Sequence, residues 1–395
     1  MRMVEKRISI GMVGAGRATE LHMQAYSYVR GIFLRYKTIM AKRVEHAELG
    51  KQRYRFECVA ENFDEMLQDE EIDVIDICTP PYVHADMIEQ SLRAGKYVIC
   101  EKPLTGYFGE TGDLEPIGIN VSKQKMYEKV IEKMDSLRAV ITEYPNKFMY
   151  AENFIYAPSI QKMAEIILKK KSRILCMRGE ESLKGSSSHV AGEWSKTGGG
   201  TFIRTGSHPL SAVLWLKQIE ARAYGSDIEV ESVIADMGCI TKNLNAYDHR
   251  HILARPNDVE DFGTAVITFS DKTKAVITAT DTLLGGSRNY VEAYCNDAVL
   301  YSNLTLNDNL QTYFLDEDRL EEVYISEMLP SKLGWNKTFI ADEIMRGYVA
   351  EIQDFMECIV YHREPVSGFK LAYDTTKLIY ASYLSAENEQ KVCFK

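Results

Sequence analysis

The first residues able to do chemistry lie in a glycine-rich turn near the N-terminus. Gly14-Ala15-Gly16 follows a strand-like run over 8–13 and precedes residues 17–29, which have helical spacing. One glycine permits a tight turn, and the next lets backbone N–H groups approach a pyrophosphate at the helix N-terminus. The third position of the pattern is Thr19 instead of glycine or alanine, so the turn alone indicates a nucleotide site only weakly.

A second candidate is the lysine of Cys100-Glu101-Lys102-Pro103, which follows the apolar run 97–100. In open α/β sheets, ligands bind outside the carboxyl ends of the strands, and a lysine there points into the crevice. Desolvation can lower the pKa of such a lysine toward the working pH, where it can act as a proton-transfer group. An isolated Glu-Lys-Pro is more often a surface turn.

A third candidate is the histidine that follows Gly198-Gly199-Gly200. These glycines lead into a predicted helix that contains His208. Imidazole is a frequent general acid or base, although a lone helical histidine more often caps or fills a core. Only the order of the three signals along one chain makes them informative together.

The elements that must position these residues alternate between strand and helix over the first half. Strands are predicted at 8–13, 35–40, 74–78 and 97–100, with helices over 17–29, 42–49 and 83–94. This alternation predicts a doubly wound parallel sheet, the Rossmann arrangement. We place this dinucleotide-binding domain at residues 1–150, with the polar stretch Gly106 to Ser122 as an inserted surface loop.

The pattern changes beyond residue 225. Strands at 230–234, 264–269, 274–280 and 290–295 follow one another without long helices, which predicts a mainly antiparallel sheet. Two helical stretches, 344–362 and 373–388, close the chain. The prediction is an α/β domain followed by an α+β domain over residues 151–395.

Composition excludes several classes of function. The net charge of −10, from 47 basic and 57 acidic residues, offers no footprint for nucleic acid or an anionic membrane. Eight cysteines occur singly, so neither a disulfide framework nor a zinc site is indicated. Asp248-His249-Arg250-His251 clusters metal-ligand types, but a solvated loop is the favoured interpretation, and no metal is predicted. We expect a cytoplasmic chain, because no apolar run spans a bilayer and no signal segment precedes the first strand.

With these motifs in order, the sequence resembles the Gfo/Idh/MocA family of NAD(P)-dependent sugar and inositol oxidoreductases. The resemblance rests on Gly14-Ala15-Gly16 with His22, the block from Asp73 to His84, Glu101-Lys102-Pro103 and the Gly-Gly-Gly…His208 block. It implies a Rossmann domain followed by a sheet-rich domain that covers the nicotinamide and binds substrate. Because that sheet commonly joins subunits in the family, it also implies a homo-oligomer.

The resemblance assigns a role to each matching position. Lys102 matches the catalytic lysine, and His208 matches the histidine that works with it. Cofactor contacts are implied at Gly14, Gly16, Arg17, Ala18, Lys42, Arg43, Thr79, Pro80, His84, Glu101 and Lys102. Substrate contacts are implied at Lys102, Tyr156, Trp194, Arg204 and His208. Trp335, beside Gly334, is an equal candidate for a sugar-stacking platform or for structural packing.

The sequence departs from the family pattern at two positions. Arg204 replaces the acidic residue usually found four positions before His208, so Lys102 and His208 must share the proton transfers. An Arg-Thr-Gly-Ser-His-Pro motif resembles members that oxidise C3 of glucosides, including C-glycosides. Ala41-Lys42-Arg43 stands where an acid normally binds the adenosine ribose; Arg43 either accepts a 2′-phosphate, which favours NADP, or stacks on adenine with NAD. The subgroup favours NAD.

The leading prediction is therefore NAD-linked oxidation of a secondary hydroxyl of a glucoside, first at C3, to a 3-oxo sugar. The new ketone acidifies the neighbouring carbon, which allows a downstream enzyme to cleave a C-glycoside by elimination. The alternatives are an inositol or free-sugar dehydrogenase and a redox-neutral NAD-dependent glycosidase. A non-catalytic nucleotide-binding regulator needs neither Lys102 nor His208 and is the least favoured.

Overall fold

The first sheet consists of six parallel strands. In the computed structural model, which describes residues 6–394 apart from 187, 189, 306–309, 315–330, 332 and 339–341, their order is β3-β2-β1-β4-β5-β6. The strands are β1 (Arg7–Val13), β2 (Phe33–Met40), β3 (Cys58–Val59), β4 (Val74–Ile77), β5 (Tyr97–Glu101) and β6 (Phe148–Ala151). This order reverses between β1 and β4, and such a reversal opens a crevice at the carboxyl ends of the strands. The predicted Rossmann sheet is confirmed.

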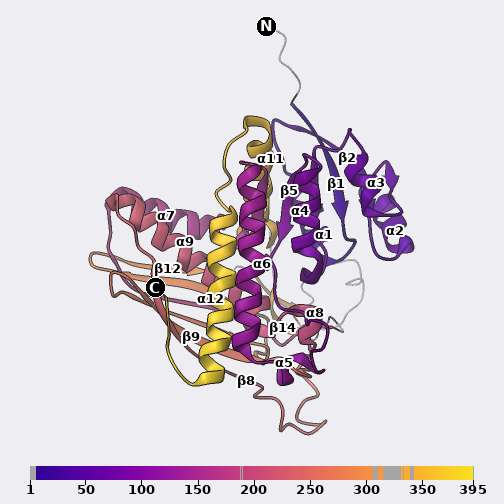
Figure 1. Ribbon diagram of the computed structural model, residues 1–395. Coiled ribbons are helices and arrows are strands. Elements are labelled where there is room, and N and C mark those ends of the chain that lie inside the picture. Colours follow the sequence, from indigo (N-terminus) through magenta and orange to yellow (C-terminus); the bar gives the residue numbers. More distant parts are fainter. Residues whose placement is uncertain are drawn as a thin grey trace.

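Helices between these strands bury the sheet on both sides. They are α1 (Arg17–Tyr26), α2 (Val44–Tyr54), α3 (Phe63–Gln68), α4 (His84–Arg93), α5 (Ile117–Asn120) and α6 (Lys123–Glu143). All four residues of β4 are buried, which explains why this strand is a continuous apolar run interrupted only by Asp76. The long helix α6 lies beside the chain's last helix, α12 (Phe369–Asn388) (Figure 1).

The second sheet has seven strands in the order β12-β11-β7-β10-β9-β8-β15. They are β7 (Ile174–Ser182), β8 (Val230–Gly238), β9 (Phe262–Phe269), β10 (Lys274–Thr280), β11 (Arg288–Cys295), β12 (Val299–Asn303) and β15 (Val392–Cys393). Only the β7–β10 pair is parallel, so the predicted mainly antiparallel sheet is confirmed. β13 (Leu310–Phe314) and β14 (Gly334–Thr338) pair antiparallel in a separate two-stranded sheet.

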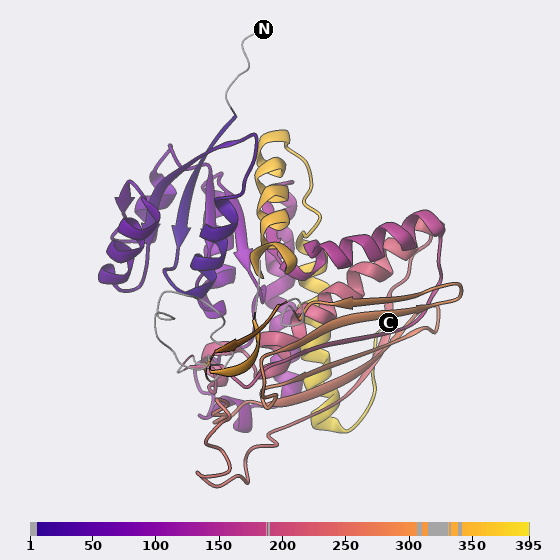
Figure 2. The same ribbon diagram turned by 180° about the vertical axis from the view of Figure 1, so that it is seen from behind.

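Further helices lie in the second half of the chain, and one of them, which packs on the second sheet, carries part of the site. They are α7 (Pro158–Lys170), α8 (Trp194–Thr197), α9 (Ser207–Tyr224), α10 (Asp342–Met345) and α11 (Tyr348–Tyr361). Helix α9 packs against β7, α7 and α12, and the view from behind shows the broad sheet extending away from these helices (Figure 2). His208 is the second residue of α9, so its position is set by this buried helix.

The segment Gly106 to Ser122 is not a surface loop as predicted. Tyr107 and Ile117 are buried, and the backbone N–H of Tyr107 donates to the hydroxyl of Tyr380 at 2.7 Å. The N–H of Gly118 donates to the Asp258 carboxylate at 2.9 Å. The polar composition that predicted a loop supplies side chains for the exposed side only, while a few apolar residues tie the segment to the second half of the chain.

The predicted helix over 344–362 is two helices. The chain breaks between α10 and α11 at Gly347, whose φ is +98°. A Cβ at Gly347 would lie 2.1 Å from the carbonyl oxygen of Asn153, so this close approach requires glycine. Across the described residues, no helix combines the length and apolar character that crossing a bilayer requires.

Candidate active site

The glycine turn has the geometry that a dinucleotide requires. Gly14 has a φ of +116°, and a Cβ there would lie 2.3 Å from the carbonyl oxygen of Cys78. A Cβ at Gly16 would instead meet no heavy atom within 4 Å, and no side chain caps α1 at Gly16. The N-terminus of α1 thus faces open space with its partial positive charge, as an incoming pyrophosphate needs.

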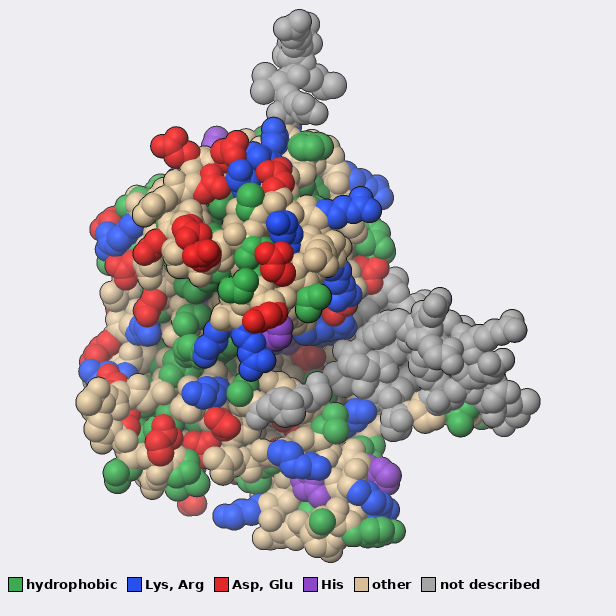
Figure 3. All heavy atoms as spheres, turned by 90° about the vertical axis from the view of Figure 1, so that its right-hand side faces the viewer, with side chains coloured by type: hydrophobic (Ala, Val, Ile, Leu, Met, Phe, Trp, Pro, Cys, Tyr) green, Lys and Arg blue, Asp and Glu red, His purple; other side chains and the backbone are tan. Residues whose placement is uncertain are grey.

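A cavity of about 490 Å³ lies next to this turn and is lined by seven of the sixteen predicted site residues, including both proposed catalytic ones. The predicted residues that line it are Arg17, Ala18, Pro80, Glu101, Lys102, Arg204 and His208. They come from α1, from the ends of β4 and β5, and from the region around α9, so the cavity lies between the two sheets. On the face shown in Figure 3, lysine and arginine side chains gather around a hollow at mid-height.

Lys102 lies directly after β5 and is tied to both halves of the molecule. Its backbone N–H donates to the Glu101 carboxylate at 2.9 Å, and its Nζ donates to the carbonyl oxygen of Arg204. The second bond aims the amine at the segment that leads to His208. The structure therefore brings Lys102 and His208 to one cavity although 105 residues lie between them in the chain.

A buried network beneath β4 supports Glu101. His22 Nδ1 lies 2.9 Å from Asp76, which also accepts from the Tyr26 hydroxyl at 2.8 Å, and His22 Nε2 lies 3.3 Å from Glu101. Although burial opposes its charged form, the Asp76 carboxylate raises the pKa of His22 well above the ordinary value. Burial likewise opposes ionisation of Glu101, but His22 holds the pKa of Glu101 below the ordinary value. The result is a charged carboxylate at the end of β5.

The same network contains three side chains of metal-ligand type, His22, Asp76 and Cys78, all buried within 4.8 Å of one another. These groups already satisfy one another, since Cys78 Sγ lies 3.5 Å from His22 Nδ1 and donates to Asp76 at 3.6 Å. We therefore interpret them as a support for the strand end. The sequence motif included His22 but left its role open between structure and cofactor.

His208 is paired with a carboxylate that the sequence did not indicate. Its Nδ1 lies 2.7 Å from the Oε1 atom of Glu152, and its ring stacks on Phe154 with centroids 4.6 Å apart. Burial lowers the pKa of His208 well below its ordinary value, and the positive charges of Lys102 and Arg346 lower it further. Burial also raises the pKa of Glu152 well above its ordinary value. A neutral imidazole, able to accept a proton, is therefore the stable form at neutral pH.

Glu181 is a second carboxylate that sequence reasoning missed. It lies on β7, lines the cavity, and places Oε2 4.0 Å from His208 Nε2 and Oε1 3.5 Å from Arg346. Neither Glu152 nor Glu181 belongs to a motif. Glu152 directly follows the apolar strand β6, and a charged residue at such a place is rarely buried without a partner, whereas Glu181 stands in the polar end of β7 and has no such signal.

Arg204 occupies the position where the family usually has an acid. Its guanidinium forms an ion pair with Asp281, at the end of β10, while its backbone carbonyl accepts from Lys102. Burial raises the pKa of Asp281, whereas Arg204 and Thr201 oppose this shift. A carboxylate is thus present near the expected place, but it comes from another strand and is paired with arginine.

Several predicted residues lie outside the cavity. The Tyr156 hydroxyl donates to Asp354 at 2.7 Å, and Tyr156 is 4% exposed, so it is a packing residue. Trp194 is also buried, against Tyr383, and lines a different cavity. His84 places its ring nitrogens 2.8 and 2.9 Å from the carbonyls of Pro103 and Thr79, which ties two strand-end loops together. Trp335 is 74% exposed on β14 and does not line the cavity.

Lys42 and Arg43 lie where the adenosine end of a dinucleotide would reach. They follow the last residue of β2, Met40, whose carbonyl accepts from the Gly14 N–H at 2.8 Å, and both side chains are exposed. Thr79 follows β4 and is partly exposed beside Pro80. These positions agree with the predicted cofactor contacts.

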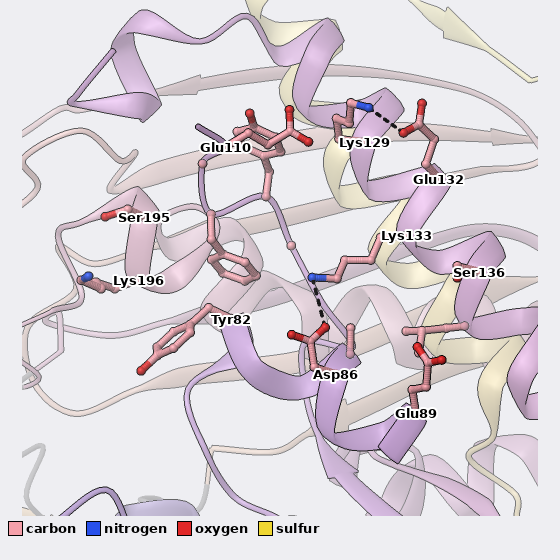
Figure 4. A pocket seen from close by; sticks show the side chains of 16 residues that line it. Tyr82, Asp86, Glu89, Glu110, Lys129, Glu132, Lys133, Ser136, Ser195 and Lys196 are labelled. Atoms are coloured by element: carbon pink, nitrogen blue, oxygen red, sulfur yellow. Dashed lines mark hydrogen bonds and ion pairs between the residues drawn. The ribbon is translucent and has the colours of Figure 1, made fainter. Parts of the chain in front are cut away.

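A different cavity of about 660 Å³ lies between α4 and α6 (Figure 4). Its ionisable side chains neutralise one another in pairs: Lys133 lies 3.9 Å from Asp86, and Lys129 donates to Glu132 at 2.8 Å. None of the predicted catalytic or cofactor residues lines it. We assign no function to this cavity.

Glu351, on α11, is a buried carboxyl with no hydrogen-bond partner for either oxygen among the described residues. Burial raises its pKa well above the ordinary value. Because the folded-state pKa exceeds the unfolded one, this group favours folding below about pH 4.3, and the contribution is lost as the pH rises through the folded-state pKa. We expect Glu351→Gln to stabilise the protein by about 1–3 kcal/mol at pH 8 and by much less at pH 5.

Urea unfolding at the two pH values measures this difference. Glu128→Gln, at an exposed site on α6, serves as the control and should change stability little at either pH. An equal effect of Glu351→Gln at pH 5 and pH 8 would show that ionisation of Glu351 does not limit stability.

The fold and the cavity define a two-domain, dinucleotide-binding oxidoreductase. Residues 8–115 match a family model described as "Oxidoreductase family, NAD-binding Rossmann fold", and residues 174–301 match one described as "GFO/IDH/MocA C-terminal domain". The chain belongs to the Gfo/Idh/MocA family and is an NAD-dependent oxidoreductase.

Individual relatives are more distant. A levoglucosan dehydrogenase of Pseudarthrobacter phenanthrenivorans is 30% identical over 105 residues, which make up 25% of this chain and 27% of that enzyme. The crystal structure of GenD2 from gentamicin A biosynthesis in complex with NAD is 19% identical, with a TM-score of 0.78 over 100% of this chain and 98% of that one. Apo scyllo-inositol dehydrogenase from Lactobacillus casei is 19% identical, with a TM-score of 0.73 over 99% of both chains. At these identities the two solved structures show a shared fold.

Proposed function

We propose that this enzyme oxidises a secondary hydroxyl of a cyclic sugar, with C3 of a glucoside, including a C-glycoside, as the first candidate. The observation that carries the proposal is the single cavity in which Lys102 and His208 lie beside the nucleotide turn. The local similarity to a levoglucosan dehydrogenase supports a sugar substrate. The arginine at position 204 supports the glucoside subgroup, because that replacement belongs to the motif that resembles it.

His208 is proposed as the group that accepts the hydroxyl proton. Nδ1 is paired with Glu152, so the proton goes to Nε2. The charge of the imidazolium that forms favours ionisation of Glu152, and the carboxylates of Glu152 and Glu181 then stabilise it. When bound, NAD supplies the acceptor for the carbinol hydrogen, which leaves as hydride to the nicotinamide C4. Removal of the proton by His208 and of the hydride by NAD together converts the alcohol to a ketone.

Lys102 is proposed to hold the reacting oxygen. One of its N–H bonds is committed to the Arg204 carbonyl, which fixes the side chain, and the ammonium charge stabilises the negative charge that develops on the substrate oxygen. The same charge contributes to keeping His208 neutral before the reaction. Lys102 and His208 therefore have complementary electrostatic roles.

Two alternatives keep specific support. An inositol or free-sugar dehydrogenase is favoured by the likeness to scyllo-inositol dehydrogenase, since the same pair of groups can oxidise any ring carbinol. A redox-neutral NAD-dependent glycosidase would use the same first step and then eliminate the aglycone. A regulator without catalysis leaves the pairing of Lys102 and His208 in one cavity unexplained.

The proposal is tested by incubating the purified protein with NAD and a panel of methyl β-glucoside, levoglucosan, myo-inositol, scyllo-inositol and a flavonoid C-glucoside. We expect a product lighter by two hydrogens, with an equal amount of NADH, for the glucosides. Oxidation of the inositols alone would select the first alternative. Free aglycone without NADH would select the glycosidase, and no product from any compound would overturn the proposal.

A further inference from the structure

A side cavity of about 510 Å³ adjoins the catalytic cavity. The two share three lining residues, Ser186, Ser188 and Arg204. The side cavity extends from this shared wall toward Asp281 and the segment around Pro256. Its volume falls within the roughly 300–1,000 Å³ that is typical of small-molecule sites.

Arg204 connects the two cavities through different parts of one residue. Its backbone carbonyl holds Lys102 in the catalytic cavity, whereas its guanidinium pairs with Asp281, which lines only the side cavity. The side chain of Arg204 is 18% exposed, and its Nε has no hydrogen-bond partner among the described residues. Nε itself is buried, so a ligand in either cavity meets the exposed part of the Arg204 side chain instead.

The walls of the side cavity differ in chemistry. Its apolar side chains are Ala191, Leu253, Ala254, Pro256 and Val259. Its hydrogen-bonding side chains are Ser186, Ser188 and the charged Arg204, Arg255, Glu260, Asp261 and Asp281. An apolar ring that carries a hydroxyl suits both kinds of side chain, because the ring packs on the apolar ones and the hydroxyl meets the polar ones.

We propose that the side cavity binds the hydroxylated aromatic aglycone of a glycoside whose sugar ring reacts at Lys102 and His208. The inference rests on the proposed function and narrows its substrate class from sugars in general to aryl glycosides. A free monosaccharide or an inositol occupies the catalytic cavity alone and leaves the apolar side chains of the side cavity without a partner. The aglycone contacts therefore select among substrates that share the same reacting ring.

The test compares two glucosides that differ only in the aglycone, 4-hydroxyphenyl β-glucoside and methyl β-glucoside. Ala191→Trp fills the side cavity from its wall. We expect this variant to lower kcat/KM for the 4-hydroxyphenyl glucoside by at least about tenfold, because loss of a ring contact in a pocket has an effect of that order. For methyl β-glucoside the change should stay within about twofold.

Ala298→Trp is the matched control, because Ala298 lies in the β11–β12 turn and lines neither cavity. The control should change neither substrate's kcat/KM. Equal losses for both glucosides in Ala191→Trp, or no preference of the wild type for the aryl glucoside, would overturn the inference. Cellobiose oxidised faster than the aryl glucoside would also overturn it, in favour of a second sugar ring.

A binding measurement separates this inference from the proposed function. Titration calorimetry of the wild type and Ala191→Trp with 4-hydroxyphenyl β-glucoside, in the presence of NAD, needs no turnover. We expect at least about a tenfold increase in Kd in the variant. Unchanged binding would overturn the side-cavity inference, whereas lack of NADH production with every substrate of the panel would overturn the proposed function alone.

Discussion

Lys102→Ala is expected to lower kcat by about 10²-fold or more, while the Kd for NAD and the melting temperature stay close to wild type. The Lys102 amine donates to the Arg204 carbonyl at the edge of the cavity, so the fold loses one hydrogen bond there. The variant also lacks the positive charge that stabilises the negative charge developing on the substrate oxygen during turnover. Steady-state kinetics on the best substrate of the panel, with calorimetry for NAD, measures both effects.

Two further variants show whether the loss is specific to the charge at position 102. Lys133→Ala removes a lysine from the cavity between α4 and α6 and should leave turnover unchanged, because that lysine faces Asp86 and no part of the catalytic cavity. Lys102→Arg keeps the charge and should recover part of the activity if the role is electrostatic. Normal turnover of Lys102→Ala would show that the assigned chemistry is wrong.

The second large effect is expected at the pair formed by His208 and Glu152. We expect His208→Gln to reduce kcat by about 10²–10⁴-fold, because no other neutral base is paired in this way among the described residues of the cavity. Glu152→Gln keeps the size of the side chain, but the amide cannot ionise when the imidazolium forms beside it. We expect this variant to lose about 10–10²-fold in kcat with little change in KM.

The double variant distinguishes a catalytic pair from two separate structural contributions. If Glu152 acts through His208, removing both should cost no more than removing His208 alone. Additive losses, or a rise in KM without a fall in kcat, would show that Glu152 serves only the packing of η2 (Asn153–Tyr156) and α9. His46→Gln, at an exposed position on α2, controls for the loss of an imidazole and should leave kcat and KM unchanged.

The pH dependence of kcat/KM gives an independent check on this pair. Burial and the nearby cations lower the pKa of His208, so the neutral base persists below the ordinary histidine range. We therefore expect activity to fall with decreasing pH only well below pH 6.5, the ordinary value. An acidic limb centred at the ordinary histidine value would indicate that His208 is more open to water than its 4% exposure suggests.

Local patterns in the sequence were sufficient for the first half of the fold. The turn at Gly14 is short range, because its φ of +116° and the neighbouring strand are dictated by adjacent residues. Alternation of apolar strands and amphipathic helices likewise predicted β1, β4 and β5, and with them the crevice that contains Lys102. The same reasoning failed for Gly106 to Ser122, because the position of this segment is set by hydrogen bonds to residues far along the chain.

The sequence by itself was sufficient to predict the family, the Rossmann sheet, a nicotinamide cofactor and the two side chains proposed for catalysis, because each depends on a short motif or a periodic pattern. The preference for NAD over NADP came from the resemblance to the family subgroup. Only the tertiary structure decided that Glu152 pairs with His208, that Asp281 pairs with Arg204, and that Tyr156 and Trp194 are buried away from the cavity. These arrangements join residues from different strands and helices. Their electrostatic consequences depend on distance and burial, and residue type and spacing along the chain specify neither.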